Sequence, residues 1–566
     1  MNTNRINSCF SALWGVVIFV TIVLGTSWIQ GPTYGQTSDE APGLAETVDG
    51  VTATVRADRS NGFVEFVRGL EASLDMAFSG VVGFLVKILF FSILGPNHPF
   101  PFIVAVLVVG SIFFTFWHGF INVRGLRHSL DLIRGRYDNP KELGEVTHFR
   151  ALTSALSATV GLGNIAGVAI AISLGGAGAV FWMLFLAVFG MTAKFHECTL
   201  AQLYRRFNKD GSVSGGPMYY LDFGLKRLNP SLAPLGKVLA IVFAIMCIGG
   251  SLGGGNMFQA NQAFTAFNAT FLEEHAVDGS VDKPQTPEEV DQAEQRRLYH
   301  SGVFGIVMAG LVGVVILGGI TRIGAATSRI VPTMCGIYVV ASLVIIIANV
   351  QMLPSVIQDI FVNAFCPDAA FGGVIGVMVQ GFKRAAFSNE AGLGSAAIPH
   401  SAAKTDEPVR EGIVAMVGPF LDTIIVCFMT SLVILITKAN HEEGLEGAAI
   451  TAHAFASLSS WFPAVLTVCI VLFAYSTMIS WCYYGERAWS YLLGWRYLFV
   501  FRLIFVLFVF FGSIMNLGSV LDFSDLMILC MAFPNIIGGV ILAPVVKRHL
   551  IDYWRRYKSG EMKPTE

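Results

Sequence analysis

The chain has 566 residues, of which 54% are hydrophobic and 13% charged, and its mean hydropathy is +0.63. Soluble domains carry roughly a quarter charged residues, so this composition excludes an ordinary soluble enzyme and a disordered protein. The net charge of −2 gives no basic excess, and no nucleic-acid partner is expected. None of the nine Cys residues forms a C-x-x-C pair, which argues against a disulfide framework or a zinc site, and no cofactor is expected.

The N-terminal region is predicted to lie outside the membrane body. In residues 1–36, Arg5 precedes an apolar run from Phe10 to Gly25, and small residues follow near 33–35, as in a secretory signal peptide. An uncleaved anchor helix is the alternative. Residues 37–80 are polar and acidic, which predicts an extracytoplasmic linker, and 81–146 are expected to hold a peripheral membrane segment and the first transmembrane helix.

Eleven apolar runs follow, each about long enough to cross a hydrocarbon core roughly 30 Å thick at a rise of about 1.5 Å per residue. The sequence therefore predicts an all-α polytopic membrane protein that interacts with the lipid bilayer. The predicted spans are 101–118, 150–174, 178–201, 238–268, 301–320, 330–350, 356–381, 411–437, 461–484, 497–516 and 524–546.

The distribution of positive charge predicts the orientation. Of the 37 Lys and Arg residues, 27 lie in alternate loops and in the tail 547–566, while the longest intervening loop is acidic. Cytoplasmic loops carry an excess of Lys and Arg. We therefore expect a multi-pass protein of the cell inner membrane with a cytoplasmic C-terminus.

Two of the spans are predicted to be interrupted helices. Ser157 to Asn164 places two glycines at mid-membrane depth, where each costs about 1 kcal/mol relative to Ala. Pro367 to Gly373 interrupts the span 356–381. Broken helices persist in membranes only where they are buried in protein or line a cavity. Two such breaks indicate an inverted-repeat secondary transporter, with repeats at 147–350 and 351–546.

An interrupted helix has a specific chemistry. Its unwound carbonyls can bind Na⁺, and the half-helix that restarts near Leu162 to Asn164 offers free N–H groups to a carboxylate. A small amino-acid zwitterion fits both ends. Alternatively, Gly161 and Gly163 only permit close helix packing. The predicted contacts from the second break are Phe371, Gly372 and Gly373.

Five long motifs stand out along the chain: Gly161–Gly167, Gly175–Met183, Gly215–Tyr220, Phe387–Ser395 and Ser480–Arg487. Together they resemble the sodium:alanine symporter family over roughly residues 100–546. One departure is Leu184, where the family usually has a second Trp. The resemblance implies a five-plus-five inverted-repeat core, like that of the leucine transporter, and import of alanine or glycine coupled to sodium by alternating access.

The stretch Val160 to Asn164 is also similar to the first broken helix of the neurotransmitter:sodium symporters. This resemblance implies that the carbonyls of Ser157 and Val160 face a sodium ion and that Thr159 lies between substrate and ion. The Leu162 and Gly163 amides would then receive the carboxylate.

The same resemblance implies sodium contacts from Phe473, Ser476 and Thr477 in the span 461–484. Adjacent hydroxyls can supply the oxygen ligands that Na⁺ prefers. Alternatively, each hydroxyl bonds back to a carbonyl of its own helix.

Other polar residues in the spans are candidates for substrate contact or for structural bonding. Asn256 and Gln259 share one helical face and could contact the substrate, line its path or join helices. Glu197 could neutralise Lys194 or hold unwound backbone of the second broken helix. Asp422 is a functional candidate by default, with structural bonding equally open. The segment 383–410 is expected to be a cytoplasmic loop with short helices.

Other functional classes are less consistent with the sequence. A P-loop and an H-E-x-x-H motif are both absent from the sequence, which argues against an ATP-driven pump and a zinc hydrolase. A passive channel would more naturally show filter repeats or charged rings. We therefore expect a symporter, not an enzyme, with a small neutral amino acid and Na⁺ as its partners and no obligate protein partner. Proton coupling stays open as an alternative.

Overall fold

The computed structural model describes residues 62–76 and most of 100–564. Residues 140, 210, 273–286, 317–318, 367–372, 443, 458, 460 and 563 lie outside the description, and between 77 and 99 only 80, 82–83, 87 and 90–92 are described. The predicted signal peptide at 1–36 therefore lies outside the described residues. Within the predicted linker, residues 62–76 form a helix.

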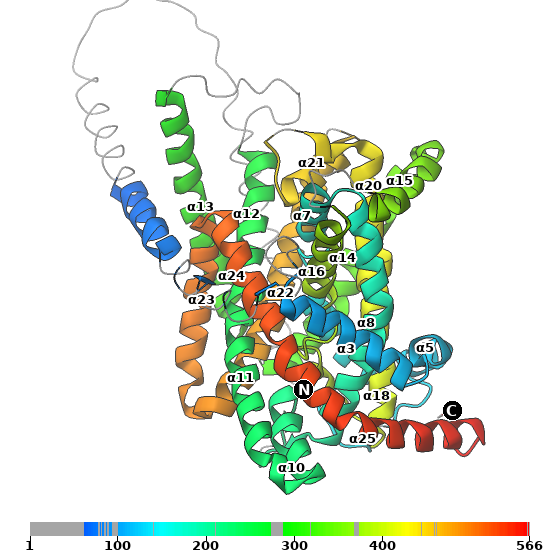
Figure 1. Cartoon of the computed structure of the whole chain (residues 1–566). Coiled ribbons are helices and arrows are strands. Elements are labelled where there is room, and N and C mark those ends of the chain that lie inside the picture. The colour runs from blue at the N-terminus through cyan, green and yellow to red at the C-terminus, as the bar shows by residue number, and fades with distance from the viewer. Residues whose placement is uncertain are drawn as a thin grey trace, which may run out of the picture.

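The described chain is almost entirely helical, which confirms the predicted all-α polytopic class (Figure 1). Before the first interrupted helix, the chain forms α3 (Phe102–Trp117), α4 (Ile121–Arg124) and α5 (Leu126–Ile133). Two short strands, β1 (Arg206–Phe207) and β2 (Val213–Ser214), pair antiparallel in a hairpin.

The first half of the core contains five membrane helices, counting an interrupted or bulged helix once. Thr147 caps the first of them, because its hydroxyl accepts a hydrogen bond from the Arg150 amide at 3.3 Å. The helices are α6 (His148–Thr159) with α7 (Ala166–Gly175), α8 (Gly178–Leu203), α11 (Ala233–Leu252) with η4 (Gly253–Met257) and α12 (Phe258–Phe271), α13 (Pro287–Ile316) and α14 (Gly319–Ala348). The short elements α9 (Pro217–Tyr219), η2 (Tyr220–Gly224), α10 (Leu225–Leu228) and η3 (Pro230–Leu232) lie between α8 and α11.

The second half follows the same count of five. Its helices are α16 (Gly373–Asn389) with α17 (Ala397–His400), α18 (Pro408–Ala415) with α19 (Val417–Pro419), η7 (Phe420–Cys427) and α20 (Phe428–Thr437), α22 (Phe462–Leu493), α23 (Leu498–Ile514), and α24 (Leu517–Cys530) with α25 (Ala532–Lys558). The short elements η5 (Val350–Met352), α15 (Leu353–Phe365), η8 (Ala439–His441), α21 (Ala448–Ala456) and η9 (Trp495–Tyr497) precede or connect them.

Among the described residues, eight helical segments are long and apolar enough to cross a membrane, and they correspond to eight of the eleven predicted spans. The predicted spans at 101–118 and 150–174 correspond to α3 and to α6–α7, whose apolar helices are shorter. The span predicted at 356–381, with an interruption at Pro367–Gly373, corresponds to two separate helices, α15 and α16, on either side of the undescribed residues 367–372.

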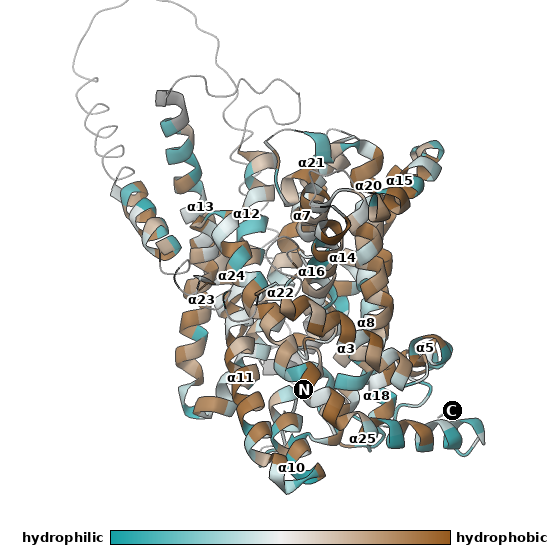
Figure 2. Ribbon diagram, viewed as in Figure 1, coloured by the Kyte–Doolittle hydropathy of each residue, from teal (hydrophilic) through white to brown (hydrophobic). Residues whose placement is uncertain are grey.

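Hydrophobic residues cover the long helices, while hydrophilic residues are frequent in the upper turns of α13 and the last turns of α25 (Figure 2). The most apolar window of α22 is 72% buried inside the protein, whereas that of the segment containing α23 is 33% buried. The segment of α22 is therefore central, and α23 presents much of its surface to lipid.

Three consecutive glycines at η4 allow the α11–α12 segment to approach its neighbours closely. A Cβ atom at Gly255 would lie 2.2 Å from Cγ of Trp481 in α22, and one at Gly254 would lie 2.2 Å from Cδ1 of Ile528 in α24. Only glycine fits against the Trp481 ring at 255, and at 254 the end of the Ile528 side chain would have to move, so this backbone packs closely against the centre of the bundle.

Candidate functional site

The first predicted interruption is confirmed by the structure. Helix α6 ends at Thr159 and α7 begins at Ala166, and the residues between them are buried. Side chains satisfy part of the unwound backbone: the amide of Gly161 donates to Oδ1 of Asn164 at 2.9 Å, and the amide of Leu162 donates to Oε1 of Gln259 at 3.1 Å. Unpaired backbone at this depth is costly, so these bonds stabilise the break.

The second interruption lies between α16 and α17, at residues 390–396. Glu390, Gly392 and Gly394 all have positive φ angles, of 55°, 81° and 89°. Left-handed backbone of this kind cannot continue a helix, and it is unusual for Glu. The residues of this turn are buried, as in the first interruption.

The position predicted for the second interruption, Pro367 to Gly373, is therefore wrong. Gly373 is the first residue of α16, with φ +64°, and lies roughly 24 Å along that helix from Asn389 at about 1.5 Å per residue. Phe371 and Gly372 lie outside the described residues, and their predicted contacts with substrate stay predictions. The segment 383–410, predicted as a cytoplasmic loop, contains the end of α16, the break itself and α17.

Charged and polar side chains hold the second interruption. Nζ of Lys194 donates to the carbonyl of Asn389 at 2.7 Å, and the amide of Gly394 donates to Oε2 of Glu197 at 3.0 Å. Nδ2 of Asn535, in α25, donates to the carbonyl of Gly392 at 2.8 Å. Of the two roles left open for Glu197, the structure shows a bond to unwound backbone, at an interruption other than the predicted one.

Asp422, in the π-helical turn η7, joins the two interruptions. Its fully buried carboxylate accepts from Nδ2 of Asn164 at 2.5 Å, from Oγ of Ser388 at 2.6 Å and from Oγ1 of Thr423 at 2.8 Å. Asn164 belongs to the first break, and Ser388 lies one residue before the end of α16. The two interrupted helices are therefore adjacent, and one carboxylate contacts both.

The residues predicted as sodium ligands meet where α6 ends against α22. Oγ of Ser157 donates to the carbonyl of Ser476 at 3.0 Å, and Oγ1 of Thr477 donates to the carbonyl of Ser157 at 3.0 Å. Ser476 itself bonds back to the carbonyl of Phe473 at 3.0 Å. Val160 follows directly at the end of α6. Carbonyl and hydroxyl oxygens from two helices are thus concentrated beside the first break.

Of three predicted substrate residues with polar side chains, one contacts the first interruption and two form bonds elsewhere. Gln259 reaches the break, since it accepts from Leu162 and donates to the carbonyl of Gly254 at 2.8 Å. Asn256 instead donates to the carbonyl of Phe505 in α23 at 2.7 Å and joins helices. Thr159 bonds back within α6, to the carbonyls of residues 155 and 156 at 3.3 and 3.4 Å.

The space at the first break is narrow. A Cβ at Gly163 would lie 3.3 Å from Cα of Ser388 and 3.4 Å from Cδ1 of Phe387, and one at Gly161 would lie 2.4 Å from Oγ1 of Thr477. The Phe387 ring packs edge-on against Phe258, with centroids 5.0 Å apart. Side chains from α12, α16 and α22 therefore crowd the glycine backbone.

Sequence reasoning missed Ser388 and Phe387 as neighbours of the first break. A usable signal was present: Gly392-Leu393-Gly394 repeats the Gly161-Leu162-Gly163 pattern, and an Asn lies near each. The structure places both Gly-Leu-Gly stretches in the two interruptions.

One further motif is excluded by its structural context. Gly249 to Gly253 match the spacing G-x-S-x-G of hydrolase nucleophile elbows, which lie on a strand-to-helix turn. Here Ser251 lies within helix α11, and its hydroxyl donates to the carbonyl of Ile248 at 2.7 Å. The serine is therefore bonded within its own helix and is not a nucleophile of that type.

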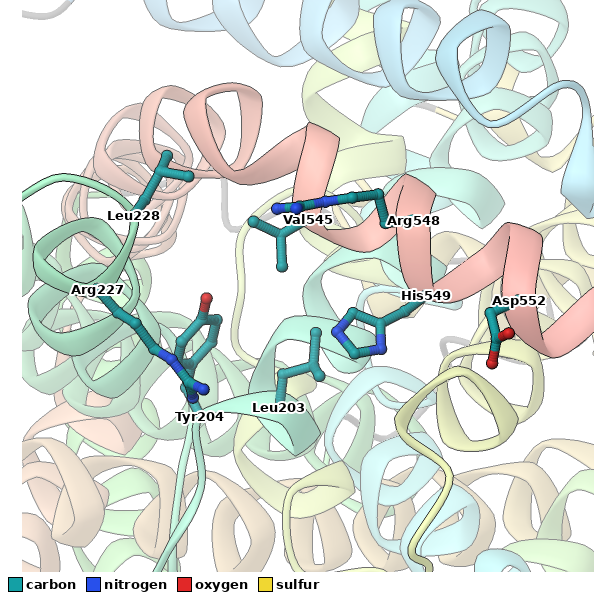
Figure 3. Close-up of a pocket in the computed structure, with 8 residues that line it drawn as sticks. All are labelled: Leu203, Tyr204, Arg227, Leu228, Val545, Arg548, His549 and Asp552. Atoms are coloured by element: carbon teal, nitrogen blue, oxygen red, sulfur yellow. The ribbon is translucent and has the colours of Figure 1, made fainter.

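One described cavity lies away from the interruptions. It measures about 620 Å³ and is lined by the end of α8, by α10 and by α25, with Arg227 beside Tyr204 and with Arg548 and His549 on α25 (Figure 3).

A polytopic helical protein whose two interrupted helices meet in a buried polar centre has the architecture of a secondary transporter. The model of the sodium:alanine symporter family matches residues 91–566, and the chain belongs to this family. The sodium/alanine symporter AgcS of Methanococcus maripaludis is 40% identical over 450 residues, covering 79% of this chain and 92% of that protein.

Two further proteins show similarity to this chain. The "Probable sodium/glutamine symporter GlnT" of Bacillus subtilis is 32% identical, over 81% of this chain and 89% of that protein. A solved structure of MhsT in complex with L-phenylalanine aligns with a TM-score of 0.44 at 14% identity, over 71% of this chain and 98% of that one.

Replacing Asp422 should destabilise both interruptions. Asp422→Ala removes the carboxylate that accepts from Asn164, Ser388 and Thr423. Asn164 keeps its 3.2 Å bond to the backbone carbonyl of residue 422, whereas the Thr423 hydroxyl loses its acceptor, and an unsatisfied buried group costs about 1–3 kcal/mol. We expect a loss of at least about 1 kcal/mol, measured as a lower thermal unfolding midpoint of the purified protein. The control Thr430→Val, on the same transmembrane segment, removes a 2.7 Å bond to the Tyr338 hydroxyl and a 2.9 Å bond to the Val426 carbonyl and should cost less. Equal stability of the two variants would contradict the central place of Asp422.

The glycines of the first break should differ in their tolerance to a methyl group. Gly161→Ala places Cβ against Thr477, whereas Gly167→Ala, in α7, meets only the carbonyl of Leu162 at 3.9 Å. We expect Gly161→Ala to weaken sodium-dependent alanine binding at least about tenfold, which is 1.4 kcal/mol, and Gly167→Ala to leave it nearly unchanged. Isothermal titration with alanine in NaCl measures both affinities. Similar affinities for the two variants would contradict a binding site at Gly161.

Proposed function

We propose that this protein imports a small neutral amino acid, alanine or glycine, together with Na⁺ by alternating access. The observation that carries the proposal is the contact between the two interrupted helices through Asp422, beside the oxygen-rich junction of Ser157 and Thr477. Unwound carbonyls and hydroxyls can replace the hydration shell of Na⁺, and free amides at a restarting helix favour a carboxylate.

The proposed sodium site consists of the carbonyls of Ser157, Val160 and Phe473 with the hydroxyls of Ser476 and Thr477. In support, the Ser157 carbonyl already accepts a hydrogen bond from the Thr477 hydroxyl. A sodium ion at this junction would bind both oxygens while the hydroxyl proton turns away from it. The ion would thereby tie the unwound end of α6 to α22.

The proposed substrate site lies against Gly161, Leu162 and Gly163, with Gln259 beside it. Because Gln259 occupies the Leu162 amide in this structure, a substrate carboxylate would have to displace that side chain. The closeness of Phe387 and Thr477 to these glycines supports a small substrate. A relative named as a sodium/alanine symporter supports the same substrate class, whereas another is named for glutamine.

The driving force is adequate for one sodium ion per substrate. One charge crossing 100 mV yields about 2.3 kcal/mol, and a roughly tenfold Na⁺ gradient adds about 1.4 kcal/mol. Together these sustain a gradient of several hundredfold in a neutral amino acid. The alternation of Lys- and Arg-rich segments supports an inner-membrane location with a cytoplasmic C-terminus.

The decisive measurement is uptake of radiolabelled alanine into proteoliposomes. Replacing external Na⁺ by choline at fixed pH should reduce uptake to the level of empty liposomes, because the ion supplies the driving force. Undiminished uptake would exclude sodium coupling. Uptake that follows an imposed proton gradient would favour proton coupling, and uptake that never exceeds equilibrium under any gradient would favour a channel.

Variants of two nearby hydroxyl residues in α22, Thr477 and Ser480, test the proposed sodium site. Thr477→Val removes a proposed ligand and should raise the Na⁺ concentration for half-maximal alanine uptake at least about tenfold. The control is Ser480→Ala, since Ser480 is also buried and its hydroxyl has no hydrogen-bond partner among the described residues. The control should keep the normal Na⁺ dependence. An unchanged Na⁺ dependence in Thr477→Val would remove Thr477 from the site.

A further inference from the structure

A second cavity, of about 360 Å³, lies where the end of α3 meets the last turns of α25. Its lining contains no Asp or Glu. Four cationic side chains line it: Arg124, Lys547, Arg555 and Lys558. Like charges confined to one cavity repel each other, so the cavity is complementary to an anion.

Aromatic rings position two of these cations. Nζ of Lys547 lies 4.5 Å from the centre of the Trp117 ring, and Cζ of Arg124 lies 5.5 Å from that of Trp554. Each pair joins the α3–α4 side of the cavity to α25. Cation–π contacts orient a cation but leave its charge uncompensated.

Little of the charge is neutralised by the protein. Arg555 pairs with Asp552 at 2.7 Å on the exposed surface. Within the described part of the chain, no ion pair is recorded for the other three cations. At least three positive charges therefore remain available to a bound anion.

The cavity continues onto an apolar surface. Two of its lining residues, Phe116 and Ile551, are 63% and 61% exposed. Helix α3 is apolar and ends at Trp117, whereas the last turn of α25 is basic. The cavity therefore lies at the level where hydrocarbon gives way to water, a level at which tryptophan is enriched in membrane proteins.

We propose that this cavity binds the headgroup of an anionic phospholipid. The phosphate lies among Arg124, Lys547, Arg555 and Lys558, and the acyl chains extend along Phe116 and Ile551. Basic pockets between membrane helices recognise anionic headgroups in this way. A soluble phosphate would use the cations but not the exposed apolar residues, so the surface favours the lipid over the free anion.

The larger cavity provides a matched comparison. It lies against the same helix α25 and also presents two arginines, Arg227 and Arg548, but its lining includes the carboxylate of Asp552 and contains no tryptophan (Figure 3). Removing its two positive charges changes the net charge of the protein as much as removing two from the proposed lipid site.

Native mass spectrometry of the full-length protein in detergent tests the proposal. The probes are dioctanoyl phosphatidylglycerol, dioctanoyl phosphatidylcholine and sn-glycerol 3-phosphate. We expect saturable binding of the phosphatidylglycerol, at least tenfold weaker in Arg124→Gln/Lys547→Gln and less than twofold weaker in the control Arg227→Gln/Arg548→Gln. Phosphatidylcholine and glycerol 3-phosphate should bind at least tenfold more weakly than phosphatidylglycerol.

A second variant separates a loss of binding from a loss of structure, because replacing Arg124 and Lys547 also removes their contacts with aromatic rings. Arg555→Gln/Lys558→Gln removes two exposed charges without a recorded cation–π contact and should weaken phosphatidylglycerol binding in the same direction. The proposal is overturned if both pocket variants bind like the wild type, or if the control loses as much affinity. Equal binding of phosphatidylcholine, or of glycerol 3-phosphate, would also overturn it.

Discussion

The structure depends on one constraint: backbone groups inside a membrane protein must find partners within the protein. Two transmembrane helices are interrupted, and each exposes amides and carbonyls that a continuous helix would pair. Asn164 and Gln259 supply acceptors at the first interruption, and Lys194 and Glu197 supply a donor and an acceptor at the second. Much of the polar content at the centre of the bundle is therefore accounted for by the two interruptions.

The first interruption could be predicted because glycines and an asparagine stand out in an otherwise apolar run. The second was not predicted, because Lys383 and Arg384 gave its segment the charge of a cytoplasmic loop, although its Gly-Leu-Gly stretch repeats that of the first interruption. In the structure Arg384 is 2% exposed and forms an ion pair with Asp525 of α24. A cation paired inside the protein carries no information about orientation, and only the fold reveals its partner.

Side-chain roles were less predictable than helices, since they depend on tertiary partners. The motif resemblance correctly brought Ser157 and Thr477 together, because it aligned two distant segments. Asn256 and Gln259 share a helical face in the sequence, yet a π-helical turn at η4 lies between α11 and α12. Asn256 bonds to α23 while Gln259 reaches the first break. Such a turn changes which residues share a face, and periodicity alone does not show it.

The contacts also form an unbroken series across the centre of the bundle. The Thr477 hydroxyl donates to the Ser157 carbonyl near the end of α6. The unwound segment that follows is held by Asn164, which accepts from the Gly161 amide. Asn164 and Ser388 of α16 both donate to the Asp422 carboxylate. Contiguity alone does not establish coupling. The energetics add a second argument, because separating α7 from α16 would leave at least one buried donor unpaired, at about 1–3 kcal/mol. The two interrupted helices therefore either move together or separate only when another polar group, from the protein or from a ligand, replaces the lost bond.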